Sequence, residues 1–136
     1  MEVSIRTSAE VIDYAITARV VIRYSAHRPY EVRMQIGEDS RVEWIFGREL
    51  LAEGLEAPPW RAAGDGDVQV WTTNSTPPRV IVQLYSPDDD GTARLGLPWE
   101  DVARLVQRSY RVVPRGQESR HLDIDRAIRA LMGGVA

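Results

Sequence analysis

The 136-residue chain has no cysteine and no lysine, and only two histidines, His27 and His121. Without cysteine it cannot form a disulfide, a thiolate zinc site or a thiol nucleophile. Two histidines leave little material for a histidine metal cluster or a paired proton relay. These absences argue against an enzyme, and we expect a protein without a metal or other cofactor in a reducing, cytoplasmic setting.

Long hydrophobic runs are absent as well. The first residues, MEVSIRTSAEVIDYAI, lack the basic start and apolar stretch of a signal peptide, and no later stretch is apolar for long enough to span a bilayer. We therefore expect no export and no direct membrane insertion. The length and the 43% hydrophobic content fit a single domain over residues 1–136.

All basic residues are arginine, and they are unevenly distributed. Residues 1–93 carry 9 arginines against 15 acids, whereas residues 94–136 carry 8 arginines against 5 acids, within a net charge of -3. The densest arginine run is Arg104 to Arg115. Arginine forks suit carboxylates, phosphates and interfaces, although biased codon usage explains an all-arginine complement equally well.

Alternating apolar and polar residues predict strands through the first hundred residues. Residues 10–24 are expected to form one long strand or two joined by a bend, with Tyr14 and Ile16 on the same side as Val20 and Ile22. Residues 30–36 place Tyr30 inward and form a hairpin with residues 42–46. Further strands are expected at residues 67–73, 79–86 and 92–97, and the apolar residues on both faces of 79–86 indicate a central or covered strand.

Helical spacing replaces alternation in three places. A short helix follows Phe46 directly and is closed by Gly54, and a longer one begins at Pro98 and extends to Val113. Asp123 is expected to cap a last helix that buries Ile124, Ala127, Ile128 and Leu131 and ends at Gly133. Strands first and helices last give an α+β protein, with an antiparallel, barrel-like sheet followed by two C-terminal helices.

Aromatic residues on strands beside arginines suggest one binding function. Tyr30, Trp44 and Trp71, with Arg33 and Arg41 nearby, could stack the bases of a single-stranded nucleic acid. The strand-rich half is acidic, however, and a nucleic-acid binder usually concentrates positive charge. A core or subunit interface is therefore the favoured location for these rings, and nucleic-acid binding is not expected.

Several motifs together resemble one family. RYSAHRPYEVRMQI, VEWIFGRELLAEGL, GDGDVQVW, VIVQLYSPDDDGTARL and ESRHLDIDRAI occur in this order from Arg23 onward. They resemble the SsgA-like proteins of sporulating actinomycetes, and the run from Val42 to Leu55 is the most specific part.

The resemblance implies a non-catalytic scaffold of sporulation-specific cell division. Such a protein positions septa at the division site by recruiting or stabilising the ring of the tubulin-like protein FtsZ. It acts partly through other SsgA-like family members and a membrane-bound septum partner. The implied fold is similar to that of the whirly and mitochondrial guide-RNA-binding proteins, assembled as a homotrimer. Because those proteins bind single-stranded nucleic acid, that function remains the alternative.

Within that architecture, the strand 42–46 and the helix 48–55 would lock a sheet edge. Arg48, Glu49 and Glu53 would then face outward to a partner or a neighbouring subunit. Trp44, Phe46 and Trp71 complete the set of interface candidates. The simpler alternative is that the junction only folds the domain, because regularly spaced apolar residues are usually core.

Overall fold

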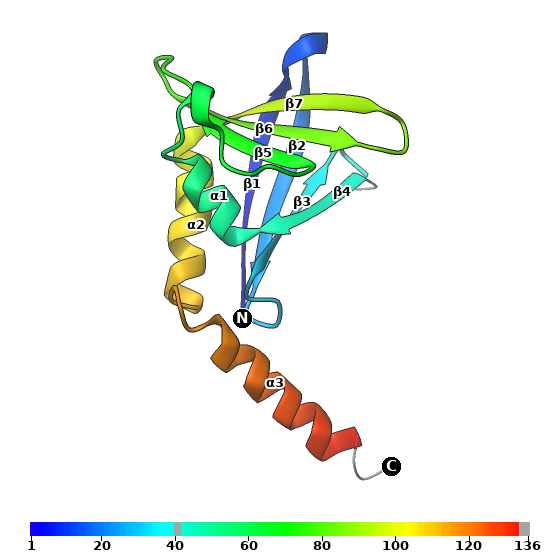
Figure 1. Cartoon of the computed structure of the whole chain (residues 1–136), viewed down its shortest axis with the longest axis vertical. Helices are drawn as coiled ribbons and strands as arrows, with labels where there is room; N and C mark the ends of the chain where they lie inside the picture. The colour runs from blue at the N-terminus through cyan, green and yellow to red at the C-terminus, as the bar shows by residue number, and fades with distance from the viewer. Residues whose placement is uncertain (40–41, 134–136) are drawn as a thin grey trace.

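The computed structural model describes residues 1–39 and 42–133, without the side chains of residues 122–125. The described chain forms seven strands, three α-helices and two 3₁₀ turns (Figure 1). In chain order these are β1 (Glu2–Val11), η1 (Ile12–Tyr14), β2 (Ile16–Ser25), β3 (Glu31–Ile36), β4 (Val42–Gly47), α1 (Arg48–Gly54), η2 (Pro59–Arg61), β5 (Val68–Thr72), β6 (Arg79–Ser86), β7 (Gly91–Pro98), α2 (Trp99–Val112) and α3 (Glu118–Gly133).

The strands form one antiparallel sheet in the order β4-β3-β2-β1-β7-β6-β5. β1 meets β7 only through the pairs Glu10–Gly96 and Val11–Leu95. The halves β4–β1 and β7–β5 are therefore joined at one corner and cross each other, so the sheet curls into a half-barrel (Figure 1). The predicted α+β class, with an antiparallel barrel-like sheet and two C-terminal helices, is confirmed.

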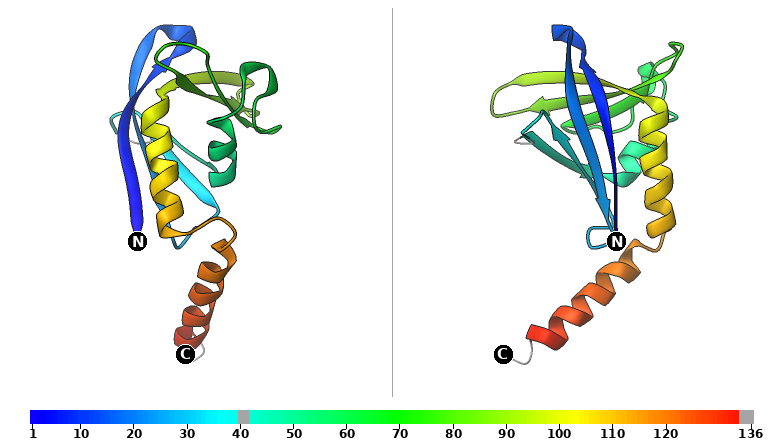
Figure 2. Two further views of the ribbon diagram at one scale, coloured as in Figure 1. Left: turned by 90° about the vertical axis from the view of Figure 1, so that its left-hand side faces the viewer. Right: turned by 180° about the vertical axis from the view of Figure 1, so that it is seen from behind.

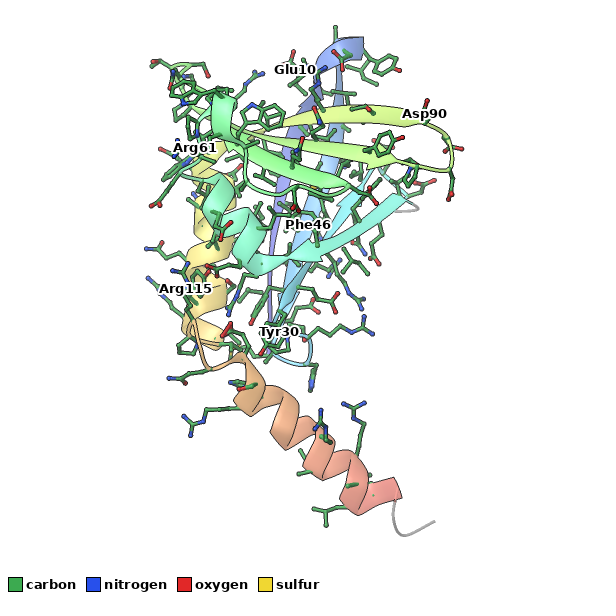
Figure 3. The ribbon with its side chains drawn as sticks, in the orientation of Figure 1. Glu10, Tyr30, Phe46, Arg61, Asp90 and Arg115 are labelled. Carbon is green, nitrogen blue, oxygen red and sulfur yellow. The ribbon has the colours of Figure 1, made fainter. Side chains whose placement is uncertain are left out.

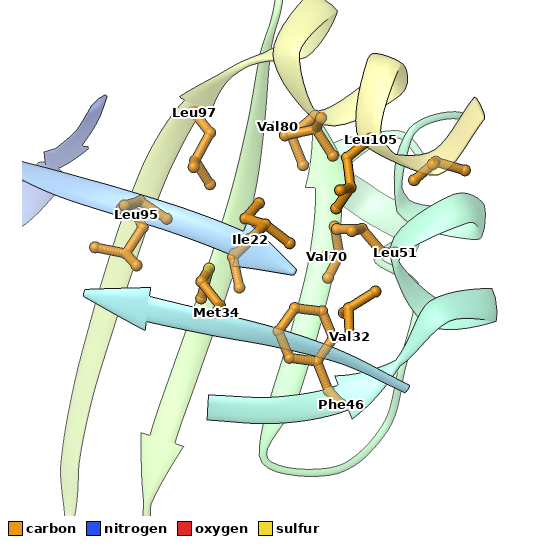
Figure 4. Packing of buried hydrophobic residues seen from close by; sticks show 14 of the residues in the cluster. Ile22, Val32, Met34, Phe46, Leu51, Val70, Val80, Leu95, Leu97 and Leu105 are labelled. Carbon is orange, nitrogen blue, oxygen red and sulfur yellow. The ribbon is translucent and has the colours of Figure 1, made fainter. Parts of the chain in front are cut away.

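The core fills the space between the two half-sheets and the helices α1 and α2. Met34 from the first half, Val70 from the second and Leu51 and Leu105 from the helices converge there with no exposed surface (Figure 4). α2 begins directly after Pro98 and buries Val102, Leu105 and Val106, as its periodicity predicts. Burial of these side chains is the main stabilising term of the fold.

Several strand predictions are confirmed. β3 and β4 form the expected hairpin, with Ile36 opposite Val42, while Ser40 and Arg41 of its turn lie outside the described residues. β6 lies between β7 and β5, and Ile81 on its second face is only 4% exposed. The apolar residues on both faces of β6 therefore did indicate an internal strand.

The N-terminal prediction needs correction. The run 10–24 is broken by η1 and by Ala15 in the left-handed region (φ 52°), so the version with a bend holds. The preceding strand, β1, begins at Glu2, and only its last two residues fall within the predicted run. Tyr14 and Ile16, predicted on the same side as Val20 and Ile22, are exposed because they sit at the tip of the β1–β2 hairpin, beyond the core. Tyr30 is also exposed, because it precedes β3.

The last helix also differs from its prediction. α3 starts at Glu118, after Gly116 with φ +87°, so Asp123 lies within the helix and does not cap it. The predicted end at Gly133 is confirmed. Ile128 and Leu131, predicted buried, are 50% and 75% exposed because α3 leaves the body instead of covering the sheet (Figure 2). The side chain of Ile124 lies outside the described residues.

Candidate functional site

The β4–α1 junction is fixed at both ends of the short helix. Gly47 closes the strand, and the backbone N–H of Arg48 donates to the Tyr30 carbonyl at 2.8 Å. At the other end Gly54 lies against β5, where an added Cβ would come 2.1 Å from Val70 Cγ1. Only glycine permits that approach, because the contact distance is far below ordinary van der Waals packing. The abrupt change from strand to helix therefore sets one position for α1 against the sheet.

The prediction that Arg48 faces outward is wrong, because its side chain is only 2% exposed. Its Nη1 donates to the carbonyl oxygens of Ser109 at 3.1 Å and Val113 at 2.7 Å. Both carbonyls lie at the C-terminal end of α2, which carries partial negative charge, and the Ser109 carbonyl also accepts from the Val113 backbone N–H at 2.9 Å. Arg48 is buried because its guanidinium group is bound by carbonyls at the negative end of this helix, so it is a structural link between α1 and α2.

Two tyrosine rings enclose the same guanidinium group. The Arg48 Cζ atom lies 4.7 Å from the centre of the Tyr24 ring and 4.3 Å from that of Tyr110, both within cation–π range. The Tyr24 hydroxyl donates to the Pro29 carbonyl at 3.0 Å, and burial raises the pKa of Tyr24 to about 12. The cluster therefore ties β2, α1 and α2 together around one buried charge.

The cluster also reaches α3. Arg48 Nη2 lies 3.6 Å from Glu118 Oε2 in the first turn of that helix. Within the described residues, Arg48 Nη2 donates no hydrogen bond and Glu118 Oε1 accepts none. The ion pair is thus long and incompletely satisfied, in contrast to the short bonds from Arg48 to α2. It marks the start of α3 as a weaker attachment than the α1–α2 contact.

Glu49 and Glu53 lie on the exposed side of α1, as predicted. Glu49 Oε2 accepts a hydrogen bond from the Tyr110 hydroxyl at 3.2 Å and pairs with Arg115 Nε at 3.3 Å (Figure 3 labels Arg115). Among the described residues, the Glu53 carboxylate has neither an ion pair nor a side-chain hydrogen bond. Glu53 is therefore the carboxylate of this helix that remains available to a partner.

The three aromatic interface candidates, Trp44, Phe46 and Trp71, do not lie together. Phe46 is buried in the core (Figure 4), and Trp44 packs at the core's edge beside an apolar hollow of about 340 Å³. Trp71 follows the fully buried Val70 on β5, so it points to the opposite face of that strand. The structure therefore does not bring Trp44, Trp71 and the exposed Tyr30 onto one stacking platform.

A further exposed surface lies on α3, where the sequence predicted a buried face. Ile128, Leu131 and Met132 form an exposed apolar stripe on α3. The spacing of these residues predicted an apolar stripe but could not tell whether the chain's own sheet or another molecule would cover it, because the helical pattern is the same in both cases.

The arginine run Arg104 to Arg115 lies mainly on α2. The side chains of Arg104, Arg108 and Arg111 are exposed along that helix.

Among the side chains that the structure describes, no group of three or more His, Asp or Glu is placed to hold a metal ion. None of the described helices is both long and apolar enough to cross a membrane.

Comparison with known proteins shows consistent relatives. The family model "Streptomyces sporulation and cell division protein, SsgA" matches residues 18–118. The sporulation-specific cell division protein SsgB of Kineococcus radiotolerans is 44% identical over 115 residues, covering 82% of this chain and 66% of that protein. SsgB of Salinispora tropica is 39% identical over 124 residues, covering 88% of this chain and 83% of that protein.

Solved structures agree with this assignment. SsgB of Streptomyces coelicolor superposes with a TM-score of 0.78 at 32% identity, covering 89% of this chain and 95% of the other. An SsgA-like sporulation-specific cell division protein from Thermobifida fusca gives a TM-score of 0.78 at 29% identity, covering 94% and 93%. The shared region includes the curled sheet and the helices that follow it. The chain therefore belongs to the SsgA family of sporulation and cell division proteins.

Proposed function

We propose that this protein is a non-catalytic scaffold of sporulation-specific cell division, which positions septa by recruiting or stabilising the FtsZ ring. The observation that carries the proposal is its similarity to SsgB proteins over 82–88% of the chain, together with the shared fold. Other SsgA-like proteins and a membrane-bound septum protein are the further partners proposed, with the chain on the cytoplasmic side of the septum.

The exposed side of α1 is the surface we assign to FtsZ. Arg48 and Gly54 hold this helix in one position, and a surface that is already ordered loses less conformational entropy when it binds. Glu53 presents there a carboxylate that pairs with none of the described residues, next to the paired Glu49. Such a surface can select a partner by charge without any chemical step.

A pelleting experiment with polymerised FtsZ tests the proposal. Wild-type protein is expected to sediment with FtsZ polymers and to increase the amount of polymer. Glu53→Arg should reduce co-sedimentation by about tenfold, because it places a repulsive charge in the contact. Asp88→Arg, which makes the same charge change in the exposed β6–β7 turn, should bind like wild type.

The outcomes of this experiment distinguish FtsZ binding itself from the assignment of the contact to α1. Wild-type protein that ignores FtsZ polymers would contradict direct recruitment. Equal binding by wild type and both variants would retain FtsZ binding but reject α1 as the contact. A septal position of the fluorescently tagged protein in sporulating cells is also expected, and a uniform distribution would count against the septum assignment.

We also propose that the scaffold is a homotrimer, with α3 in the subunit interface. α3 has 16 residues, and isolated helices of this length are marginal in water without a tertiary or quaternary partner. Its exposed Ile128, Leu131 and Met132 would gain stability from burial against a second copy. A partner subunit would then complete the packing that the chain's own sheet does not provide.

Light scattering of two variants, changed at neighbouring positions of α3, tests the trimer. Leu131→Asp places a charge on the apolar stripe and should lower the solution mass from trimer to monomer. Ala130→Asp makes a similar change about 100° around the helix and should leave the mass unchanged. A monomeric wild type, or a Leu131→Asp variant with undiminished mass, would refute this arrangement.

A further inference from the structure

The outer face of β1, β2 and β3 carries four arginines. Arg6 lies on β1, Arg19 and Arg23 on β2, and Arg33 on β3. Their strand neighbours Ile5, Val20, Ile22, Val32 and Met34 are buried, at 7% exposure or less. Because side chains alternate along a strand, the four arginines point away from the core. We call this surface the arginine face.

None of the helices that the structure describes covers this surface. α1 and α2 pack on the core side of the sheet, and the view from behind shows no helix crossing in front of β1 and β2 (Figure 2). A hollow of about 500 Å³ is lined by Arg6, Arg19 and Arg23. A second hollow of about 220 Å³ adjoins it through Arg23 and includes Arg33. The guanidinium groups therefore border open space that a ligand can enter.

The charge on this face is only partly balanced. Arg23 pairs with Glu2 at 3.2 Å, and the exposed Arg19 lies 3.8 Å from Glu38. Such exposed pairs contribute only about 0–1 kcal/mol and exchange readily for another carboxylate. Arg6 and Arg33 form no ion pair with any residue in the described part of the chain.

Two of the arginines are direct cross-strand neighbours. Arg23 pairs with Arg33 in the β2–β3 ladder, and like charges in such positions destabilise a sheet. Arg6 is opposite Val21, so it lies diagonally from Arg23 on the same face. The three form a row across three strands. An incoming anionic group would relieve their mutual repulsion.

We propose that the arginine face binds an extended, carboxylate-rich segment of a protein partner. The diagonal pair Arg6 and Arg23 is about 7–8 Å apart, and the directly opposite pair Arg23 and Arg33 is about 4.5–5.5 Å apart. The roughly 6.7 Å between same-side side chains of an extended peptide lies between these two spacings. Acidic residues at alternate positions of such a peptide can therefore each meet one arginine. The planar guanidinium fork donates two parallel hydrogen bonds to a carboxylate.

The face favours a peptide over a nucleic acid for two reasons. The outward residues of β1, β2 and β3 within the described chain include no aromatic ring, whereas single-strand binders stack bases on such rings. Glu2 and Glu38 also stand among the arginines, where they would repel a continuous phosphate chain. Separate carboxylates can be placed between them. This inference does not depend on FtsZ being a partner.

Fluorescence anisotropy with defined probes tests the inference. The probe is a labelled peptide of alternating glutamate and serine, roughly twelve residues long, at about 50 mM salt so that screening is moderate. The full-length variant Arg6→Gln/Arg23→Gln/Arg33→Gln should bind it at least about tenfold more weakly than wild type. The matched variant Arg104→Gln/Arg108→Gln/Arg111→Gln removes the same charge from α2 and should stay within about twofold.

Three further outcomes decide the nature of the site. Replacement of Arg6, Arg23 and Arg33 by lysine should restore only part of the affinity, because lysine keeps the charge and loses the fork. Equal losses in both glutamine variants would overturn the site in favour of net charge. Tighter, face-dependent binding of a thymidine oligonucleotide of the same charge would overturn the peptide assignment. Amide shifts of the wild-type protein should map to β1, β2 and β3 even if a variant misfolds, and shifts elsewhere would reject the face.

Discussion

The β4–α1 junction and α3 are both amphipathic, yet the chain buries the apolar side of the junction only. At the junction, Arg48 donates to two carbonyls of α2 and Leu51 is fully buried. On α3, Leu131 and Met132 remain 75% exposed. The difference indicates that the buried side of the junction supports the fold of one subunit, whereas the apolar side of α3 is a surface that another molecule can cover. The predictions below test this division of roles.

Removal of the buried guanidinium should have the largest effect. Arg48→Ala removes the side-chain hydrogen bonds to the Ser109 and Val113 carbonyls and leaves Glu118 without its counter-charge. We expect the free energy of unfolding to fall by about 3–5 kcal/mol. Urea denaturation measures this, with the exposed Arg108→Ala as control, which should change stability by less than about 0.5 kcal/mol. Equal effects would show that the buried cluster is not what fixes the helices.

A methyl group at Gly54 should have the next largest effect. The new Cβ would lie 2.1 Å from Val70 Cγ1, so α1 or β5 must shift. We expect Gly54→Ala to lower the free energy of unfolding by about 1–3 kcal/mol. Gly66→Ala is the matched control, because its Cβ would meet nothing within 4 Å. A Gly54→Ala protein as stable as this control would show that the close approach is not required.

The sequence predicted elements whose determinants are local. The β3–β4 hairpin, the strands β5–β7 and the stripe of α2 all follow from alternation, turn residues and a proline at the helix start. β1 was missed because its inward positions include the small or polar Thr7 and Ala9, which weaken the pattern. Turn chemistry and periodicity therefore specify most of this fold, while small inward side chains conceal a strand.

The candidate site was less predictable because its contacts are long-range. Arg48 bonds to residues 61 and 65 positions away in the sequence, so no local pattern reports its burial. Arginine is rarely buried unless paired, which made an outward position the natural expectation. Glu49 and Glu53, whose exposure depends mainly on the face of one short helix, were placed correctly.

A smaller, pH-dependent effect is expected from Tyr24. Its pKa is raised from 10.0 to about 12, first by burial, so the folded protein retains the hydroxyl proton longer than the unfolded chain. This contribution is complete below pH 10 and is lost as the pH rises from 10 towards 12. Tyr24→Phe loses the bond to Pro29, at a cost of about 1 kcal/mol near neutral pH. The stability gap between the two proteins should narrow above pH 10, and a constant gap would contradict the burial effect.

The smallest effect on the subunit itself is expected from the α3 stripe. Ile128→Ser/Leu131→Ser removes apolar groups that the subunit leaves exposed, so its unfolding free energy should change by less than about 0.5 kcal/mol in dilute, monomeric protein. Val102→Ser makes the same kind of change on the buried stripe of α2 and should cost at least about 2 kcal/mol. Urea denaturation over a range of protein concentrations separates the two helices. A concentration-dependent loss in the α3 variant places its side chains between subunits, whereas a loss as large as that of Val102→Ser in the monomer would mean that α3 folds back onto its own body.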